Sequence, residues 1–371
     1  MRIGIDGRLW NETGVGRYIR NLVWELQKVD KKNEYVLFVK SGINKQDVKI
    51  TQHNWKIIET DIHWHSLAEQ IKFPQALEKE NLDLVHFPYF SLPIFYNKPF
   101  VVTIHDLIIN HFPTGKASTL PYPLYQLKRV GYSAVLNHAV KNAEKIIVPL
   151  HAVEEDVIKT LGTLRERIAV TYEGASQAKI SQAHFKQDKK YFLYVGNAYP
   201  HKNLATLLDA FTQFRKENHE DVSLVLVGKD DYFYKILSEK IAEEKIEGME
   251  LKHSLSDPEL FALYSQAIAF VSASHMEGFG LPPLEAMSSG CLVLLSDIPS
   301  FREVCQDIAF YFDPSSATAL KKQMQIVYNL DHKKKQLRQA NGRERVKDFS
   351  WEKMAKQTLK IYESCISLRS S

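Results

Sequence analysis

The chain has 371 residues, of which 44% are hydrophobic and 25% charged, and its formal net charge is +4 at pH 7. The length predicts two domains with separate cores, and the composition is that of an ordinary globular protein. The small positive excess lies in the first half of the chain. It is too weak to indicate a nucleic acid partner, but it suits weak attraction to anionic lipid or phosphorylated substrates. Three cysteines without metal-ligand spacing, no apolar run of membrane-spanning length and a strand directly after Met1 predict a cytoplasmic protein without a signal peptide.

The first half of the chain alternates between strand-like and helix-like segments. We expect strands at 2–6, 35–39, 56–59, 82–87, 100–105, 145–148 and 168–172, and helices at 17–28, 66–80 and 122–142. This alternation predicts a parallel sheet with helices on both faces.

Two short motifs follow strands of this half. Gly14-Val15-Gly16-Arg17 lies in an expected loop at 7–16, where glycines would let a phosphate or a sugar approach the backbone. A plain tight turn explains these glycines equally well, because the third glycine of the dinucleotide fingerprint is missing. His105-Asp106 ends the strand at 100–105 and therefore lies on the ligand side of the sheet. A buried core histidine beside a helix-capping aspartate is the better explanation for such a pair taken alone.

The expected helix at 122–142 and its flank to 145 are basic and aromatic, with Tyr125, Lys128, Arg129, Tyr132 and Lys141. Such a segment fits the surface of a membrane. A solvated helix whose tyrosines face the core is the commoner arrangement, and we favour it.

The polar stretch 174–190 predicts a linker, after which a second alternating unit begins. Its expected strands are 191–195, 223–228, 250–253, 268–273, 291–295 and 309–312. Its expected helices are 204–216, 232–244, one that starts at Ser256 with Glu259 as capping partner, 282–289, 315–329, 331–349 and 351–368. Two similar α/β units predict a ligand site in a cleft between them.

The stretch Glu277-Gly278-Phe279-Gly280-Leu281-Pro282-Pro283-Leu284-Glu285 forms a glycine-rich loop and the start of a helix after a buried strand. Helix-opening N–H groups can hold an anion there, and both glutamates can face one ligand. Glu285 alone could be a first-turn cap, but that leaves Glu277 and the paired glycines unexplained. Lys202, near another helix start, supplies positive charge that suits a diphosphate. A carboxylate pair beside a phosphate cradle indicates a sugar nucleotide.

Taken together, these motifs resemble the retaining glycosyltransferases of family 4, and among them mannosyltransferase-like enzymes of surface polysaccharide assembly. The resemblance covers nearly the whole chain. It rests on Gly4-Ile5-Asp6-Gly7-Arg8, Thr13-Gly14-Val15-Gly16-Arg17-Tyr18, Thr103-Ile104-His105-Asp106-Leu107, Pro200-His201-Lys202-Asn203-Leu204, the stretch from Glu277 to Ala286, and Phe349-Ser350-Trp351-Glu352. It implies an α/β fold of two Rossmann-like domains whose parallel sheets face a central cleft (GT-B). The implied domains are an acceptor-side domain at 1–175 and a sugar-nucleotide domain at 188–350, with the last helix at 351–371 packing back on the first domain.

The resemblance also implies roles for individual residues. Glu285 would bind the ribose, Glu277 the hydroxyls of the donor sugar, Lys202 and the backbone at Gly280 and Leu281 the diphosphate, and residues from His253 to Leu255 the base. His105 would approach the C6 hydroxyl of the sugar. The expected catalytic residues are His105, Lys202 and Glu277. The expected donor-binding residues are Gly14, Gly16, Arg17, Asn197, Lys202, His253, Leu255, Glu277, Gly278, Phe279, Gly280, Leu281 and Glu285.

One position departs from the family pattern. Many relatives carry an arginine after the glycine at the position of Gly196, where this chain has Asn197. Lys202, helped by Arg17, would then carry more of the charge of the leaving group.

The expected activity is transfer of a hexose from a nucleotide sugar to a glycan or lipid-linked acceptor with retention of configuration. GDP-mannose is the first expected donor and a UDP-sugar the second, both from the resemblance alone. We expect no metal, because the chain has no Asp-x-Asp motif, and no cofactor beyond the substrate. Peripheral contact with the inner face of a membrane, through the first domain, fits such an acceptor.

Three other functions are compatible with parts of this pattern. A catalytically dead relative that binds nucleotide or glycan is the main alternative, and Asn197 favours it mildly. The missing third glycine argues against a nicotinamide-dependent oxidoreductase. A glycosidase acid/base pair would not need a phosphate cradle.

Overall fold

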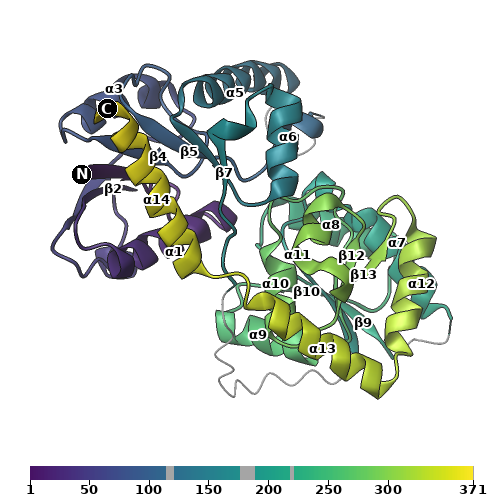
Figure 1. The fold of residues 1–371 in the computed structure, drawn as a ribbon. Coiled ribbons are helices and arrows are strands. Elements are labelled where there is room, and N and C mark those ends of the chain that lie inside the picture. The colour runs from purple at the N-terminus through teal and green to yellow at the C-terminus, as the bar shows by residue number, and fades with distance from the viewer. Residues whose placement is uncertain (114–120, 176–188, 218–220, 371) are drawn as a thin grey trace. The chain divides into compact units, whose positions relative to one another are not determined.

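The computed structural model describes residues 1–113, 121–175, 189–217 and 221–370. These residues form two compact α/β units, one made of residues 1–107, 121–174 and 349–370 and the other of 108–113 and the described part of 175–348 (Figure 1). The helix that ends the chain therefore belongs to the first unit. Residues 108–113 belong to the second unit, which the expected domains did not anticipate. Most of the linker expected at 174–190 lies outside the described residues.

The first unit is built on a seven-stranded sheet in the order β3-β2-β1-β4-β5-β6-β7, in which all neighbours are parallel. Its strands are β1 (Arg2–Asp6), β2 (Glu34–Lys40), β3 (Trp55–Thr60), β4 (Leu84–Phe87), β5 (Phe100–Thr103), β6 (Lys145–Val148) and β7 (Ile168–Val170). The central strands are almost wholly buried, as expected for a sheet with helices on both faces.

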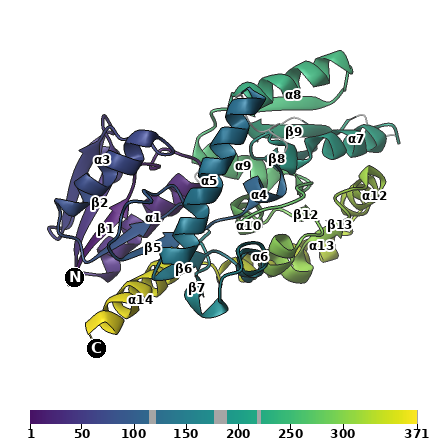
Figure 2. The ribbon, with the colours of Figure 1, turned by 90° about the horizontal axis from the view of Figure 1, so that it is seen from above.

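Helices cover both faces of this sheet. They are α1 (Gly14–Val29), α2 (Lys45–Val48), α3 (Leu67–Glu78), α5 (Tyr122–Asn142), α6 (His151–Leu161) and α14 (Trp351–Ser370), with a 3-10 turn at Arg165–Arg167. Figure 1 shows α14 lying along α1, and Figure 2 shows α3 and α5 together on the opposite face. The last helix thus completes the first unit after the chain has built the second.

The second unit is built on a six-stranded parallel sheet in the order β10-β9-β8-β11-β12-β13. The strands are β8 (Tyr191–Val195), β9 (Ser223–Gly228), β10 (Met249–His253), β11 (Phe270–Ser272), β12 (Val293–Ser296) and β13 (Phe310–Phe312). The helices are α4 (Ile108–His111), α7 (Leu204–Arg215), α8 (Tyr232–Glu243), α9 (Asp257–Gln266), α10 (Leu281–Ser288), α11 (Pro299–Cys305), α12 (Ala317–Tyr328) and α13 (His332–Val346), with 3-10 turns at Pro200–Lys202 and Gln306–Ile308. The predicted class of two α/β domains with parallel sheets is confirmed.

The strand order of each sheet reverses at one place, between β1 and β4 in the first and between β8 and β11 in the second. Ligands of open α/β sheets bind outside the carboxyl ends of the strands at such reversals. The segments that follow β8 and β11 are therefore expected to line a ligand site of the second unit.

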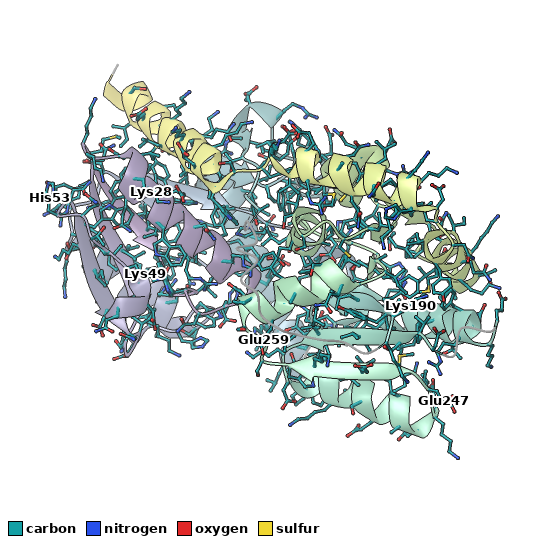
Figure 3. All side chains as sticks on the ribbon, turned by 90° about the horizontal axis from the view of Figure 1, so that it is seen from below. Lys28, Lys49, His53, Lys190, Glu247 and Glu259 are labelled. Atoms are coloured by element: carbon teal, nitrogen blue, oxygen red, sulfur yellow. The ribbon has the colours of Figure 1, made fainter. Side chains whose placement is uncertain are left out.

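The predicted helix starts are partly right. The Ser256 side chain and Glu259 form the expected capping box of α9, and Glu259 is labelled in Figure 3. However, α1 begins at Gly14, so Gly14 and Gly16 lie in its first turn and not in the loop that we predicted. A Cβ on Gly16 would lie 2.6 Å from the carbonyl oxygen of Trp10, so close packing explains this glycine.

Candidate functional site

The centre of the candidate site is an ion pair between two residues from different strand ends. Lys202 follows β8 and Glu277 follows β11, the two strands that flank the reversal of the second sheet. The Nζ atom of Lys202 lies 2.7 Å from Oε1 and 2.8 Å from Oε2 of Glu277. The two side chains are only 15% and 14% exposed. The structure thus brings together two of the three expected catalytic residues.

Backbone contacts hold the two strand ends in this register. The amide N–H of His275 donates to the carbonyl of His201 at 2.8 Å. Asn203, whose φ of 56° is left-handed, donates from its side-chain amide to the carbonyls of Ala273 and Pro314. Lys202 and Glu277 therefore meet because the loops that carry them are tied together on both sides.

Local partners keep Glu277 ionised. Ser274 donates from Oγ to Oε1 of Glu277 at 2.7 Å, and Ser300 donates to its backbone carbonyl at 2.6 Å. Burial by itself would raise the pKa of Glu277, but the charge and hydrogen bonds of Lys202 and the Ser274 hydroxyl lower it. Next to the pair, burial and the Lys202 charge lower the pKa of His201 to about 4. At neutral pH this corner therefore holds one cation and one anion.

The glycine-rich stretch leads directly from this pair into α10. Gly280 precedes the helix with a left-handed φ of 90°, where a side chain would be strained. Gly278 and Phe279 are buried, and Leu281 begins the helix. The first N–H groups of an α-helix have no partner inside the helix. Because Pro282 and Pro283 have no N–H, the donors that this turn offers to an anion beside Lys202 are those of Gly280 and Leu281.

Glu285 lies in the second turn of α10, and the predicted first-turn position is wrong because the helix already begins at Leu281. This position removes the helix-cap alternative. The Glu285 side chain is 3% exposed, and the Tyr264 hydroxyl donates to its Oε2 at 3.3 Å. The assignment of Glu285 to a ribose stays a prediction.

The remaining expected donor residues of this unit serve local structure in the free protein. The Asn197 side chain accepts from the N–H of Tyr199, and its carbonyl accepts from the Tyr194 hydroxyl at 2.6 Å. His253 ends the edge strand β10, with Nδ1 3.1 Å from the Gly228 carbonyl. Leu255 is half-buried before α9. Asn197 therefore shapes its own turn and brings no positive charge to it.

In the first unit, His105 lies just beyond β5 and is 12% exposed. Its Nε2 lies 2.9 Å from the Pro88 carbonyl oxygen, and its Nδ1 lies 3.1 Å from Oε1 of Glu173. Sequence reasoning missed Glu173, although its position three residues after β7, at the same sheet edge, was a usable signal. Both ring nitrogens of His105 therefore have protein partners. The expected contact between His105 and the C6 hydroxyl of the sugar stays a prediction.

The loop after β1 is held by a buried charge cluster that sequence reasoning also missed. Arg8 donates to both carboxylate oxygens of Asp6 and to Glu69, and Glu69 accepts from Ser91.

Two other residues of the first unit that we expect to bind the donor lie at the start of α1. Gly14 has open space where a side chain would lie. Arg17, also in the first turn of α1, is half-buried, and its roles toward phosphate stay predictions.

In the described part of the chain, no group of three or more His, Cys, Asp or Glu side chains is placed to hold a metal ion. Likewise, none of the helices in this part is both long and apolar enough to cross a membrane.

Comparisons with known proteins add to this geometry. Residues 13–178 match the family described as "Glycosyltransferase Family 4", and residues 176–345 match "Glycosyl transferases group 1". The O-antigen chain mannosyltransferase RfbU of Salmonella typhimurium is 30% identical over 253 residues, which are 68% of this chain and 65% of that protein. The O-antigen chain mannosyltransferase B of Escherichia coli is 28% identical over 95% of this chain and 96% of its own length.

Solved structures agree on the fold. HepE of Anabaena, crystallised with UDP and glucose, superposes with a TM-score of 0.74 at 18% identity and covers 98% of this chain and 100% of its own. At that identity the likeness shows the fold alone. The two family matches overlap at 176–178 and together span 13–345, with the paired Lys202 and Glu277 inside the second. The chain belongs to the family 4, mannosyltransferase-like glycosyltransferases with the GT-B fold.

Proposed function

We propose that the protein transfers a hexose from a nucleotide sugar to a glycan or lipid-linked glycan, with retention of configuration. The observation that carries this proposal is the Lys202–Glu277 pair beside the first turn of α10. One corner offers a cation and helix-end N–H groups for a diphosphate, and a carboxylate for sugar hydroxyls. Mannose from GDP-mannose is the first proposed donor, because the relatives named above are mannosyltransferases. A UDP-sugar is the second, in view of the ligands of HepE.

The proposed mechanism depends on stabilising the negative charge of the leaving diphosphate. Negative charge builds on the diphosphate as its bond to the anomeric carbon breaks, and Lys202 with the N–H groups at Gly280 and Leu281 would stabilise it. In the free protein Glu277 neutralises Lys202 and holds it in place. On binding, the diphosphate would share the Lys202 charge while Glu277 accepts from the sugar. The cation is thus positioned before the donor arrives, so no reorganisation is needed at the moment of reaction.

We further propose that the reaction uses no metal ion and no cofactor beyond the substrate. The chain has no Asp-x-Asp motif, and Lys202 supplies the positive charge that a metal would otherwise bring. In family 4 enzymes that lack a protein nucleophile, the acceptor approaches from the face that the leaving group vacates. This route uses Lys202, Glu277 and the N–H groups at Gly280 and Leu281 of the second unit.

A catalytically dead binder of nucleotide or glycan is the second candidate. Asn197, whose side chain and carbonyl are both used within its own turn, favours it, since that turn lacks the family arginine. Release of nucleoside diphosphate discriminates the two, because a dead binder releases none.

We also propose that the first unit contacts an anionic membrane surface from the cytoplasmic side. Leu127 and Val130 of α5 are each 69% exposed, and Leu124 is 53% exposed. The same helix carries Lys128 and Arg129 and no acidic residue. Exposed apolar side chains interleaved with basic ones match a bilayer that contains anionic lipid. Tyr132 packs on Phe90 with ring centroids 4.8 Å apart, so this tyrosine faces the core, as we expected.

A thermal-shift panel of sugar nucleotides tests the donor assignment. GDP-mannose at 100 times its dissociation constant should stabilise the folded state by about 2.7 kcal/mol. The same screen with Lys202→Ala should show a much smaller shift. No response of the wild-type protein to any GDP- or UDP-sugar would contradict the proposal.

A further inference from the structure

Two histidines lie in the interior of the first unit, His86 on β4 and His105 just beyond the neighbouring strand β5, and they have different partners. His86, on β4, is 2.8 Å from the Thr103 hydroxyl and 2.6 Å from the Tyr362 hydroxyl. A hydroxyl can donate or accept, so these contacts suit a neutral ring. Burial lowers the pKa of His86 to about 3. This histidine is therefore uncharged at neutral pH.

His105, after β5, has two partners that only accept. A carbonyl oxygen, here that of Pro88, cannot donate, and neither can an ionised carboxylate, here that of Glu173. With Glu173 ionised, both ring nitrogens must carry a proton. Burial by itself would lower the pKa of His105, but the hydrogen bond and charge of Glu173, the Pro88 carbonyl and the charge of Asp106 together raise it.

The other groups around the His105 ring do not compete for its protons. Tyr18, from α1, meets the ring edge-on with centroids 4.8 Å apart, and its hydroxyl bonds to Thr103. Burial raises the pKa of Tyr18 above its usual range, so this phenol stays neutral. Glu173 contacts the ring directly, and the charge of Asp106 acts on it as well.

Glu173 is itself held in place by its position in the fold. It follows β7, and the next residue, Gly174, lies so close to the start of α14 that a Cβ would come within 2.3 Å of the Trp351 nitrogen. The ion pair joins the ends of β5 and β7 across β6, which lies between them in the sheet. A carboxylate anchored at this point fixes the distance and the direction of the imidazole ring.

We propose that Glu173 is a positioning residue that holds His105 as a fixed imidazolium at the carboxyl end of β5. A ring that donates from both nitrogens to protein acceptors cannot accept a proton. His105 would then act through its charge and position and not as a general base. The consequence for sugar transfer rests on the proposed function, whereas the charge state of the ring does not.

Glu173→Gln keeps the shape of the side chain and removes its charge. NMR titration of histidine Cε1 in full-length protein, with the His105 signal assigned from His105→Gln, should show its midpoint lower by about one pH unit or more in Glu173→Gln. Transfer by this variant should stay within about threefold of wild type at pH 6 and fall about tenfold or more at pH 8. The loss of transfer grows with pH because the His105 ring is charged below its titration midpoint and neutral above it, and Glu173→Gln lowers that midpoint.

Glu154→Gln is the matched control. Glu154 makes the same kind of contact, 2.8 Å from Nδ1 of His151, on α6 of the same unit. Its loss should leave both the His105 midpoint and the pH profile unchanged. Glu173→Asp retains the carboxylate and should give a His105 midpoint between those of the wild type and Glu173→Gln. This variant tests the proposal if Glu173→Gln does not fold.

An unchanged His105 midpoint in Glu173→Gln would overturn the proposal. So would a loss of transfer that is equal at pH 6 and pH 8, because that is the signature of a purely structural role. If the wild-type protein transfers no sugar at all, the proposed function fails while the NMR titration still decides the charge state of His105.

Discussion

Lys202 donates to both carboxylate oxygens of Glu277, a residue 75 positions further along the chain, at 2.7 and 2.8 Å. The pair joins the loops after β8 and β11, where the order of the second sheet reverses. Each residue therefore depends on the other for its place. A change at either one should alter donor binding, bond breaking and local stability together.

Replacing Lys202 by alanine removes the cation that would stabilise the leaving diphosphate. We expect transfer to fall about 100-fold to 1,000-fold. The free energy of unfolding should fall by roughly 1–3 kcal/mol, because Glu277 is left mostly buried without its charged partner. Steady-state kinetics and denaturant unfolding measure the two effects.

Lys321→Ala is the control for this change. Lys321 pairs with Glu217 at 2.8 Å on the surface of the same unit, where an exposed pair contributes about 0–1 kcal/mol. It should leave transfer unchanged. Full activity of Lys202→Ala would refute the assignment of the leaving-group site.

The Glu277 carboxylate should contribute stability that depends on pH. Its pKa is lowered in the folded protein, so the contribution is present above the unfolded value of about 4.3 and is lost as the pH falls through the lower folded value. The difference in unfolding free energy between wild type and Glu277→Gln should be constant above about pH 5 and shrink toward pH 3. A difference that is the same at pH 7 and pH 3 would show that the charge of Glu277 contributes nothing.

Glu285→Gln tests the ribose assignment. If Glu285 accepts from ribose hydroxyls, the variant should raise KM for a ribonucleotide sugar about tenfold and change KM for the 2′,3′-dideoxyribose analogue much less. Tyr264→Phe is the matched control, since it removes the hydroxyl that donates to Glu285 at 3.3 Å and leaves the carboxylate. Equal effects of Glu285→Gln on both donors would mean that Glu285 serves the packing of α10 and not the ligand.

Local patterns were enough to predict most of this fold. The strands at Arg2–Asp6, Lys145–Val148 and Tyr191–Val195 begin and end where the sequence indicates, because buried parallel strands read as short apolar runs between turn residues. The start of α1 was missed because glycines favour loops. Gly16 instead lies in the first turn of this helix. A glycine is needed there because a side chain would collide with the carbonyl oxygens of Leu9 and Trp10.

The partners of charged residues could not be predicted in the same way. Strand ends predicted that Lys202 and Glu277 would face one ligand, but their direct pairing depends on how the two loops pack. Arg8 with Glu69, and His105 with Glu173, are contacts between distant segments that leave no periodic signal in the sequence. A parallel sheet gathers such residues at one edge, and only the three-dimensional structure says which of them meet.

The membrane proposal predicts that the apolar face of α5 controls binding to vesicles. Leu127→Ser with Val130→Ser should abolish co-flotation with vesicles that contain 30% phosphatidylglycerol, because each change removes about 1.5–3 kcal/mol of apolar burial. Leu337→Ser is the control, since Leu337 is 62% exposed in the second unit. Equal flotation of wild type and the double variant, or equal binding of the wild type to neutral vesicles, would contradict this surface or its charge preference.

The most direct test of the central claim is release of nucleoside diphosphate from sugar nucleotides, measured with and without a lipid-linked glycan extract as acceptor. The account predicts that wild-type protein releases GDP from GDP-mannose, or UDP from a UDP-hexose, and that the extract accelerates this release. Lys202→Ala should release about 100-fold less under the same conditions. Release by Lys202→Ala at the wild-type rate, or none by folded wild-type protein from any donor of the panel, would contradict the account.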